Sequence, residues 1–481
     1  MIWYYTYINR AIVFRLKTPF NIIDEYIGFC KRFRPVRRKI MLNDLKKLIS
    51  MPTVLNEGEN GTPFGQSIAD ALQWFASRAE ELGLKAYCDR YYAYAETADG
   101  DEDNMIGIAA HLDVVPVNAD DWATDPFELV EKDGVFYGRG VADDKGPAVI
   151  CLHVLAELNK FRLKHKIRMI VGGDEETASR GLKKYCAEQK LPVCTLVPDA
   201  DFPLINSEKG ILHLNFTSAV QPSYGIVELS GGQRANMVPD HCVLKMEKSG
   251  EAMLAAGDLH ESILKRGMNA SDFRISEQDG IITVQAFGTA GHASTPEAGD
   301  NAIAKIFRLL TPLIEFDKLD KFITGADAKQ NLGLDISDEA GDLTMNAGIV
   351  SFADNKLNVS MDFRLPLCVT PERVQETLFK NLRPENIVVD KYAPNLFVSP
   401  DSKLVRTLLR CYSAVTGDHS GAQKTGGGTY ARELPNAVAF GPVFPGTETN
   451  LHNANESIPV NHLEKLYEIY LKSIAALDKE L

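Results

Sequence analysis

The sequence predicts an α/β fold with a mostly parallel sheet, into which a second domain of α+β type is inserted. The chain has 481 residues, which is more than one hydrophobic core ordinarily serves. Helical and strand patterns alternate from about residue 41 to 210, whereas segments of alternating apolar and polar residues dominate 211–375. We therefore expect the first domain over 41–210 and 380–481, and the inserted domain over 211–379.

The first domain opens with a clear helical pattern. The segment GQSIADALQWFASRAEELG (65–83) has apolar residues at helical spacing and ends on glycine, which often follows a helix. Three short apolar runs come later, in MIGIAAHLDVV (105–115), IRMIVGG (167–173) and CTLVPD (194–199). Such runs are typical of strands that are buried on both faces of a parallel sheet.

The inserted domain has a different texture. In LNVSMDFRLP (357–366), apolar residues occupy the odd positions from Leu357 to Phe363, and polar residues occupy the even positions from Asn358 to Arg364. Because successive side chains of a strand point to opposite faces, one face is apolar and the other polar. The pattern predicts a sheet with one solvated or substrate-facing side.

Charge and cysteine content narrow the class of protein. The net charge of -13 argues against a nucleic-acid partner, because binding phosphate backbones needs clustered Lys and Arg. The eight cysteines form no C-x-x-C pair and follow no secretory cleavage pattern, so we expect reduced thiols in a cytoplasmic protein.

Residues 1–40 differ from the remainder of the chain. They hold nine Lys or Arg and two acids, and their apolar clusters are too short to span a membrane. A basic arm that binds a membrane surface is one interpretation. We favour an extension that is not part of the fold, ahead of Met41, and expect no membrane partner.

Side chains with ligand chemistry follow the apolar runs. MIGIAA leads into His111 and Asp113, IRMIVGG into the acids 174–176, and CTLVP into Asp199. The functional crevice of an open α/β sheet lies outside the carboxyl ends of its strands, so these segments aim at one place. The positive end of a helix explains one exposed acid, but not acids at three strand ends beside a histidine.

A divalent cation explains this cluster, because it turns repulsion among carboxylates into coordination. Asp143 and Asp144, in YGRGVADDKGP, add further carboxylates. His111 and Asp113 share a strand face, so Asp113 can accept a hydrogen bond from the ring nitrogen that His111 does not offer to a metal. We expect two ions bridged by a carboxylate and a water, with one of the adjacent glutamates binding metal and the other facing the water.

Six stretches carry a family resemblance: HLDVVP, GRGVADDKGP, GGDEET, VPDADFPLINSEKG, GTAGHASTPEAGDNA and FGPVFPGTETNLHNANE. In this order they resemble the motif set of the M20 metallopeptidases. WATDPFEL and PDADFPLINSEKG favour the PepV-like dipeptidase branch over the related deacylases. The resemblance runs from about Met41 to the C-terminus, and implies a catalytic domain with an inserted ferredoxin-like lid domain.

The resemblance implies roles for single residues of the catalytic domain. One divalent ion would be held by His111, Asp143 and Asp199. The other would be held by Asp143, Glu176 and His452, so that Asp143 bridges the two ions. Asp113 would steady His111, and Glu175 would be the general base that takes a proton from the bridging water. The family commonly has a cis peptide after the bridging aspartate.

In the inserted domain, His292 of AGHAS resembles a lid histidine that stabilises the tetrahedral oxyanion. Asn236 of QRANMVP and Arg364 of MDFRLP match positions that bind the substrate backbone and its free carboxylate. A guanidinium fork suits a carboxylate for independent reasons. The glycines of KTGGGTYAR, including Gly428, let backbone N–H groups approach a ligand, although a simple tight turn explains the loop equally well.

We therefore expect a metal-dependent dipeptidase that hydrolyses unblocked dipeptides. Zn²⁺ suits the ligands, but so do Mn²⁺ and Co²⁺, because carboxylate-rich sites are less selective than thiolate sites. By analogy with the PepV-like branch we expect a monomer. An M20 N-acyl amino acid deacylase or desuccinylase is the alternative, and the need for a free α-amino group distinguishes the two. A binding protein that has lost catalysis is disfavoured, because Glu175 is retained beside Glu176.

Overall fold

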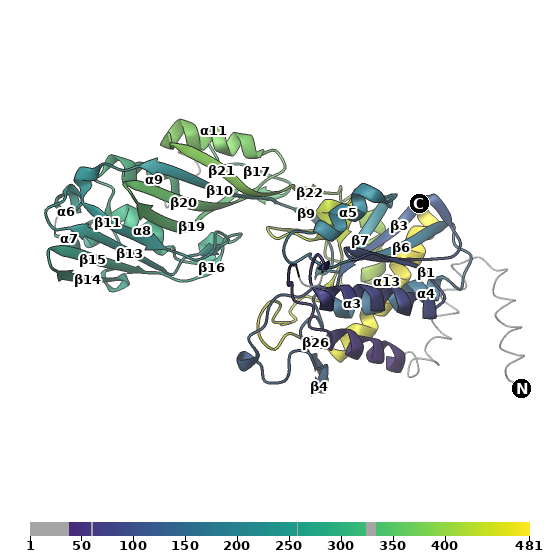
Figure 1. Ribbon diagram of the computed structural model, residues 1–481. Helices are drawn as coiled ribbons and strands as arrows, with labels where there is room; N and C mark the ends of the chain where they lie inside the picture. Colours follow the sequence, from purple (N-terminus) through teal and green to yellow (C-terminus); the bar gives the residue numbers. More distant parts are fainter. Residues whose placement is uncertain (1–37, 59–60, 257, 324–332) are drawn as a thin grey trace, which may run out of the picture. The chain divides into compact units, whose positions relative to one another are not determined.

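The computed structural model describes residues 38–58, 61–256, 258–323 and 333–481 (Figure 1). Contacts divide the chain into two compact units. Unit 1 comprises the described residues up to Asn206 together with Val398–Gln423 and Thr429–Leu481, and unit 2 comprises Ser207–Phe397 and Lys424–Gly428. The predicted bound at 210/211 lies four residues from the division at 206/207. The predicted return at 380 lies 18 residues before the division at 397/398, because the strand Asn386–Ala393 pairs within the sheet of unit 2. The prediction does not include the short segment 424–428 of unit 2. The predicted extension lies outside the described residues up to position 37, and residues 38–49 are helical.

The sheet of unit 1 has the predicted, mostly parallel core. Its strands follow the order β1 (Lys85–Cys88), β2 (Tyr92–Glu96), β6 (His165–Gly172), β3 (Asp101–His111), β7 (Cys194–Val197), β24 (Ala437–Ala439) and β9 (Ile205–Glu208). The four central strands, β6, β3, β7 and β24, pair in parallel, whereas the flanking pairs are antiparallel. Every residue of β6 is buried, as expected for a strand covered on both faces.

Helices cover this sheet. They are α3 (Gln66–Glu81), α4 (Lys145–Leu158), α5 (Arg180–Glu188), α12 (Lys403–Thr416) and α13 (Val460–Glu480). The predicted helix over 65–83 is α3, whose apolar stripe is buried against β1 and β2. Every residue of α4 is buried, because this helix packs between the sheet and α13. The N-terminus of α4, which follows Asp143 and Asp144 directly, is therefore fixed by the packing of the helix.

Unit 2 is built on an antiparallel sheet of the order β14 (Phe273–Gln278), β15 (Ile281–Phe287), β13 (His241–Glu247), β11 (Ile226–Gly231), β19 (Thr344–Ala353), β20 (Lys356–Leu365), β10 (Gly210–Ala219) and β21 (Asn386–Ala393). Its helices are α6 (Glu251–Ala256), α7 (Leu259–Lys265), α8 (Ala302–Leu309), α9 (Ile314–Ile323) and α11 (Pro371–Leu382). A small ladder of β12 (Met237–Val238) and β16 (Gly291–His292) lies beside the main sheet. This unit is the expected α+β domain.

Strand β20 shows why this sheet forms. The apolar residues at its odd positions from Leu357 to Phe363 are at most 1% exposed and belong to the core of unit 2. On the polar face Asn358 is exposed, but Asp362 and Arg364 are buried. The polar side of this strand is therefore solvated at one end only, and at the other end it carries a buried ion pair.

Candidate active site

Three strands of unit 1 end at the same edge of the sheet and carry the predicted side chains there. Strand β3 ends on His111, which is the register partner of Gly172 at the end of β6, directly ahead of the acidic loop 174–176. Strand β7 ends at Val197, two residues before Asp199. Asp143 joins them from the loop that precedes α4. These side chains therefore meet at the carboxyl ends of the parallel strands, where the functional site of such a sheet is expected.

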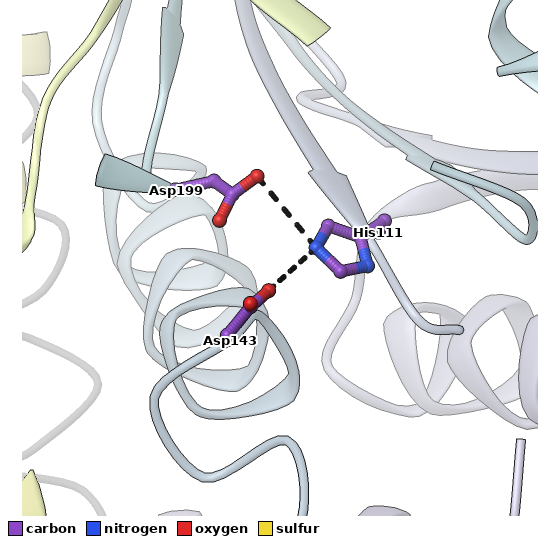
Figure 2. A group of neighbouring side chains, drawn as sticks. All are labelled: His111, Asp143 and Asp199. Atoms are coloured by element: carbon purple, nitrogen blue, oxygen red, sulfur yellow. Dashed lines mark hydrogen bonds and ion pairs between the residues drawn. The ribbon is translucent and has the colours of Figure 1, made fainter. Parts of the chain in front are cut away.

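The carboxylate of Asp143 lies between two histidines. Its Oδ1 is 2.9 Å from His111 Nε2, and its Oδ2 is 2.9 Å from His452 Nε2. Asp199 Oδ2 approaches the same nitrogen of His111 at 3.6 Å. Figure 2 marks the contacts of this nitrogen with Asp143 and Asp199 by dashed lines. Glu176 Oε2 approaches His452 Nε2 at 3.2 Å.

These contacts form two groups that share Asp143, and within each group the ligand atoms lie within 4.8 Å of one another. The groups are His111, Asp143 and Asp199, and Asp143, Glu176 and His452. The His111 side chain is 1% exposed, whereas that of His452 is 56% exposed. One end of the centre is therefore enclosed by protein and the other is open to solvent.

Asp113 does more than support His111. The His111 Nδ1 atom is 3.0 Å from the main-chain oxygen of Asp113 and 3.5 Å from its carboxylate. The two carboxylate oxygens each accept a backbone N–H at 3.1 Å, one from Glu175 and one from Glu176. The expected partner of the His111 ring is thus chiefly the carbonyl of Asp113, and its carboxylate holds the two glutamates in place.

Asp174, the first of the three acids in the loop, has a structural role. Asp174 is buried, and its carboxylate accepts the backbone N–H groups of Arg180 and Gly181 together with Nε of Arg180, each at 2.9 Å. It thereby closes the turn that leads into α5. The run of three acids divides into one that shapes the loop and two that face the site.

The pKa values of several side chains in this cluster are raised, which indicates that the cluster favours bound positive charge. Burial, together with the nearby carboxylates of Glu176 and Asp113, raises the pKa of Glu175 to about 8 in the metal-free chain. Burial likewise raises the pKa of Asp199 well above its ordinary value. Hydrogen bonds with Asp143 and Glu176 raise the pKa of His452 to about 10. Protons therefore accumulate where a divalent cation would relieve the same repulsion, and the donor set of carboxylates and imidazoles fits such ions.

The peptide bond between Asp143 and Asp144 is cis, which confirms the expectation from the resemblance. Asp144 is fully buried, and its Oδ2 accepts the backbone N–H of His111 at 3.2 Å. Of the two adjacent aspartates, the first therefore contacts both histidine side chains and the second fastens the end of β3.

Two residues in the quoted motifs received no role from the sequence. Glu456 of HNANE is fully buried, and its carboxylate accepts the backbone N–H groups of Gly140, Ala142 and Asp143 at 2.9, 2.9 and 3.1 Å. The signal that could have indicated Glu456 is a carboxylate four residues after His452, in the same quoted motif, that has no ligand role of its own. It supports the loop that carries Asp143.

Tyr430 of KTGGGTYAR is the other. It is 1% exposed, its ring lies edge-on to His111 at 6.2 Å, and its hydroxyl has no hydrogen-bond partner among the residues that the structure describes. A Cβ atom at Gly172 would lie 2.0 Å from that hydroxyl. This close approach explains why the strand ahead of the acidic loop ends in glycine.

Asn236 and His292, two of the residues predicted in unit 2, lie on neighbouring segments that are joined by backbone pairing. Strand β12 follows Asn236 and pairs with β16, with Met237 opposite His292. The carbonyl of Asn236 accepts the N–H of Ala293 at 3.0 Å. His292 Nδ1 accepts the backbone N–H of Ser294 at 3.1 Å, so the proton of the neutral imidazole is on Nε2.

Arg364 is 3% exposed and already holds several partners. Its Nε and Nη2 donate to the two carboxylate oxygens of Asp362 at 2.7 and 2.9 Å, and its Nη1 donates to the carbonyl of Gly426 at 2.8 Å. A Cβ atom at Gly426 would lie 2.8 Å from Cβ of Ser294. The glycine segment that ends at exposed Gly428 is therefore packed beside the strand end that carries His292.

An acid and imidazole centre at the carboxyl ends of a parallel sheet, with a second α+β unit, defines a metal-dependent hydrolase. The sequence profile of peptidase family M20/M25/M40 matches residues 107–476. The chain belongs to this family, so the predicted fold class and the resemblance to the M20 metallopeptidases are confirmed. It is a metal-dependent peptidase whose cofactors are divalent metal ions.

Similar proteins agree with this assignment. The chain is 30% identical over 466 residues to a Bacillus subtilis protein named "Putative dipeptidase YtjP", covering 92% of this chain and 98% of that protein. The fold of the present chain is similar to that of human carnosine dipeptidase 1 (TM-score 0.55, 12% identity, covering 93% of this chain and 98% of that one). It is also similar to the M20 metallo-carboxypeptidase Sso-CP2 of Sulfolobus solfataricus (TM-score 0.56, 17% identity, 91% and 99%). In the part of the chain that the structure describes, no helix has the length and apolar character needed to cross a membrane.

Proposed function

We propose that this peptidase is a dipeptidase that hydrolyses the amide bond of unblocked dipeptides at a centre of two divalent ions. The observation that carries the proposal is the Asp143 carboxylate, one oxygen of which faces His111 and the other His452. One ion would be held by His111, Asp143 and Asp199, and the other by Asp143, Glu176 and His452. Zn²⁺ suits these ligands, and Mn²⁺ and Co²⁺ are the alternatives.

Two bound divalent ions supply an activated water and polarise the scissile carbonyl. Glu175 would accept a proton from the attacking water and deliver it to the leaving amine. Two observations support this role. The Glu175 main chain is tied to Asp113, and burial gives its carboxyl group a high proton affinity, which suits a group that must hold a proton between the two steps.

The predicted residues of unit 2 would bind the substrate and determine its specificity. The remaining N–H groups of Arg364 would bind the free carboxylate, while Asp362 holds the guanidinium in one orientation. His292 would donate its Nε2 proton to the developing oxyanion. Asn236 and backbone N–H groups near Gly428 would bind the peptide backbone. A site that also binds the free amino group would limit the substrate to about two residues.

A matched substrate set tests the proposal. Chelator-stripped protein, resupplied with Zn²⁺, Mn²⁺ or Co²⁺, would be given a free dipeptide, its N-acetyl form, its C-terminal amide and the corresponding tripeptide. We expect metal-restored cleavage of the free dipeptide alone.

Other outcomes of this assay would indicate a different activity or no catalysis. Preference for the N-acetyl compound would replace the dipeptidase by an N-acyl amino acid deacylase, and equal cleavage of the tripeptide would remove the size limit. Binding of the dipeptide without cleavage under any of the three metals would overturn the enzymatic proposal. The proposal includes a monomer, which light scattering at the assay concentration tests.

A further inference from the structure

Two loops of unit 1 carry Asp143 and His452, which are 309 positions apart in the sequence. The first, residues 138–144, precedes α4, and the second, residues 449–456, precedes β26 (Ser457–Pro459). Neither Asp143 nor His452 lies in a helix or a strand, and His452 adopts a left-handed φ of 61°. Their relative position must be set by contacts between the two loops.

Glu456 provides the first of these contacts. Its carboxylate has no solvent exposure and accepts three backbone N–H groups of the first loop, including that of Asp143. Its own carbonyl accepts the N–H of Gly138 at 3.1 Å. The first loop is therefore wrapped around the last residue of the second.

Arg139 provides the second contact. Its Nη1 donates to Glu456 Oε2 at 2.9 Å, and its Nη2 donates to the carbonyl of Asn453, the residue after His452, at 3.0 Å. The side chain is 3% exposed, and the ring of Trp122 lies 5.2 Å from the guanidinium carbon. One planar fork thus joins the residue that holds the Asp143 loop to the residue beside His452.

We infer that the buried Arg139–Glu456 pair is the positioning element that sets the two metal-binding groups relative to each other. The inference rests on the proposed two-metal site and adds two residues that act through Asp143 and His452 without contacting the ions. Buried charges are costly unless they are paired and hydrogen-bonded. Besides the bond between them, the two side chains make four hydrogen bonds to the loops, which offset this cost.

The two members of the pair should have different effects. Glu456 supports the main chain of Asp143, which belongs to both groups, so its loss should weaken both ions. Arg139 alone reaches Asn453, so its loss should weaken chiefly the group that contains His452. Other contacts that tie the second loop to unit 1 involve residues after Asn453. They include the pairing of β26 with β5 (Val135–Tyr137) and the hydrogen bonds of Asn455 with the N–H of Ala123 and the carbonyl of Asp121.

The experiment compares metal binding by the full chain and two variants. Chelator-stripped protein is titrated with Zn²⁺ or Co²⁺ by calorimetry, and bound metal is counted after desalting. We expect two ions in the parent protein. Arg139→Lys keeps the charge but cannot span both acceptors, and should weaken one ion by about 10–100-fold with the other unchanged. Glu456→Gln places an amide N–H₂ against backbone N–H donors and should weaken both ions.

Glu96→Gln is the matched control. Glu96 and Arg168 form another buried ion pair in unit 1, at 2.6 Å, that contacts neither ligand loop. This variant should bind two ions with parental affinity. Circular dichroism of the stripped proteins verifies folding, and if Glu456→Gln does not fold, the selective loss in Arg139→Lys carries the test.

Three outcomes would overturn these ideas in distinct ways. Parental affinity for both ions in both variants refutes the positioning role. Equal weakening in Glu96→Gln shows that any broken buried pair has the same effect, which also refutes it. Fewer than two ions in the parent protein refutes the two-metal proposal itself.

Discussion

Asp143 and His452 stand 309 positions apart in the sequence, but Asp143 Oδ2 lies 2.9 Å from His452 Nε2. The other oxygen of the same carboxylate lies 2.9 Å from His111 Nε2. Asp143→Ala should therefore abolish tight binding of both ions, whereas His452→Ala should abolish that of one. Metal counting by mass spectrometry after dialysis checks this. Equal loss in the two variants would show that Asp143 does not bridge.

Glu175 and Glu176 are adjacent but should differ in function. Glu175→Ala should lower kcat by about 10²–10⁴-fold, the usual contribution of a general base, with both ions still bound. Glu176→Ala should lose the ion shared with His452. Single-turnover assays and metal counts on the same samples separate the two effects, and the reverse pattern would exchange the roles of the two glutamates.

Asp113 should stabilise the acidic loop. In Asp113→Asn one of the two acceptor oxygens becomes an N–H₂ group that faces a backbone N–H, in a side chain that is 3% exposed in the parent. Leaving such a buried donor without a partner costs about 1–3 kcal/mol of unfolding free energy. Urea denaturation of the stripped proteins measures it. An unchanged midpoint would mean that the loop is held by other contacts.

Metal uptake should release protons. Hydrogen bonds with Asp143 and Glu176 raise the pKa of His452 to about 10, and burial raises that of Glu175 to about 8. Below these values both groups are protonated in the metal-free chain, and His452 must lose its proton to bind an ion. Affinity should therefore rise with pH between 6 and 8, with release of about one proton or more at pH 7. Calorimetry in buffers of different ionisation enthalpy measures the release.

Arg364 should act on substrate affinity. Arg364→Lys leaves Asp362 a cationic partner but removes the fork, so KM for a free dipeptide should rise and kcat/KM should fall by about 10–100-fold, as for lost hydrogen bonds to a charged group. Metal binding should not change. The C-terminal amide of the same dipeptide, added as a competitive inhibitor, is the control, and an equal loss of affinity for this amide would exclude carboxylate recognition.

Much of the fold and of the site chemistry can be predicted from the sequence. The apolar runs before His111, Asp174 and Asp199 indicate buried strands, and parallel strands bring their carboxyl ends to one edge. The alternation in 357–366 indicates the second sheet. These inferences succeed because side-chain periodicity is a local property that burial imposes on each strand.

The assignment of neighbouring acids depends on the tertiary structure. Asp143 and Asp144 are chemically alike, as are the residues of the run 174–176, so the sequence by itself determined that acids meet at this edge. The family resemblance implied the contacts of Asp143 with both histidines, which the folded chain brings together. Only the folded chain decided that Asp174 closes a turn and that Glu456 supports the Asp143 loop. The physical reason is that the direction of each carboxylate is set by backbone turns and by donors from segments hundreds of residues away, which no local pattern records.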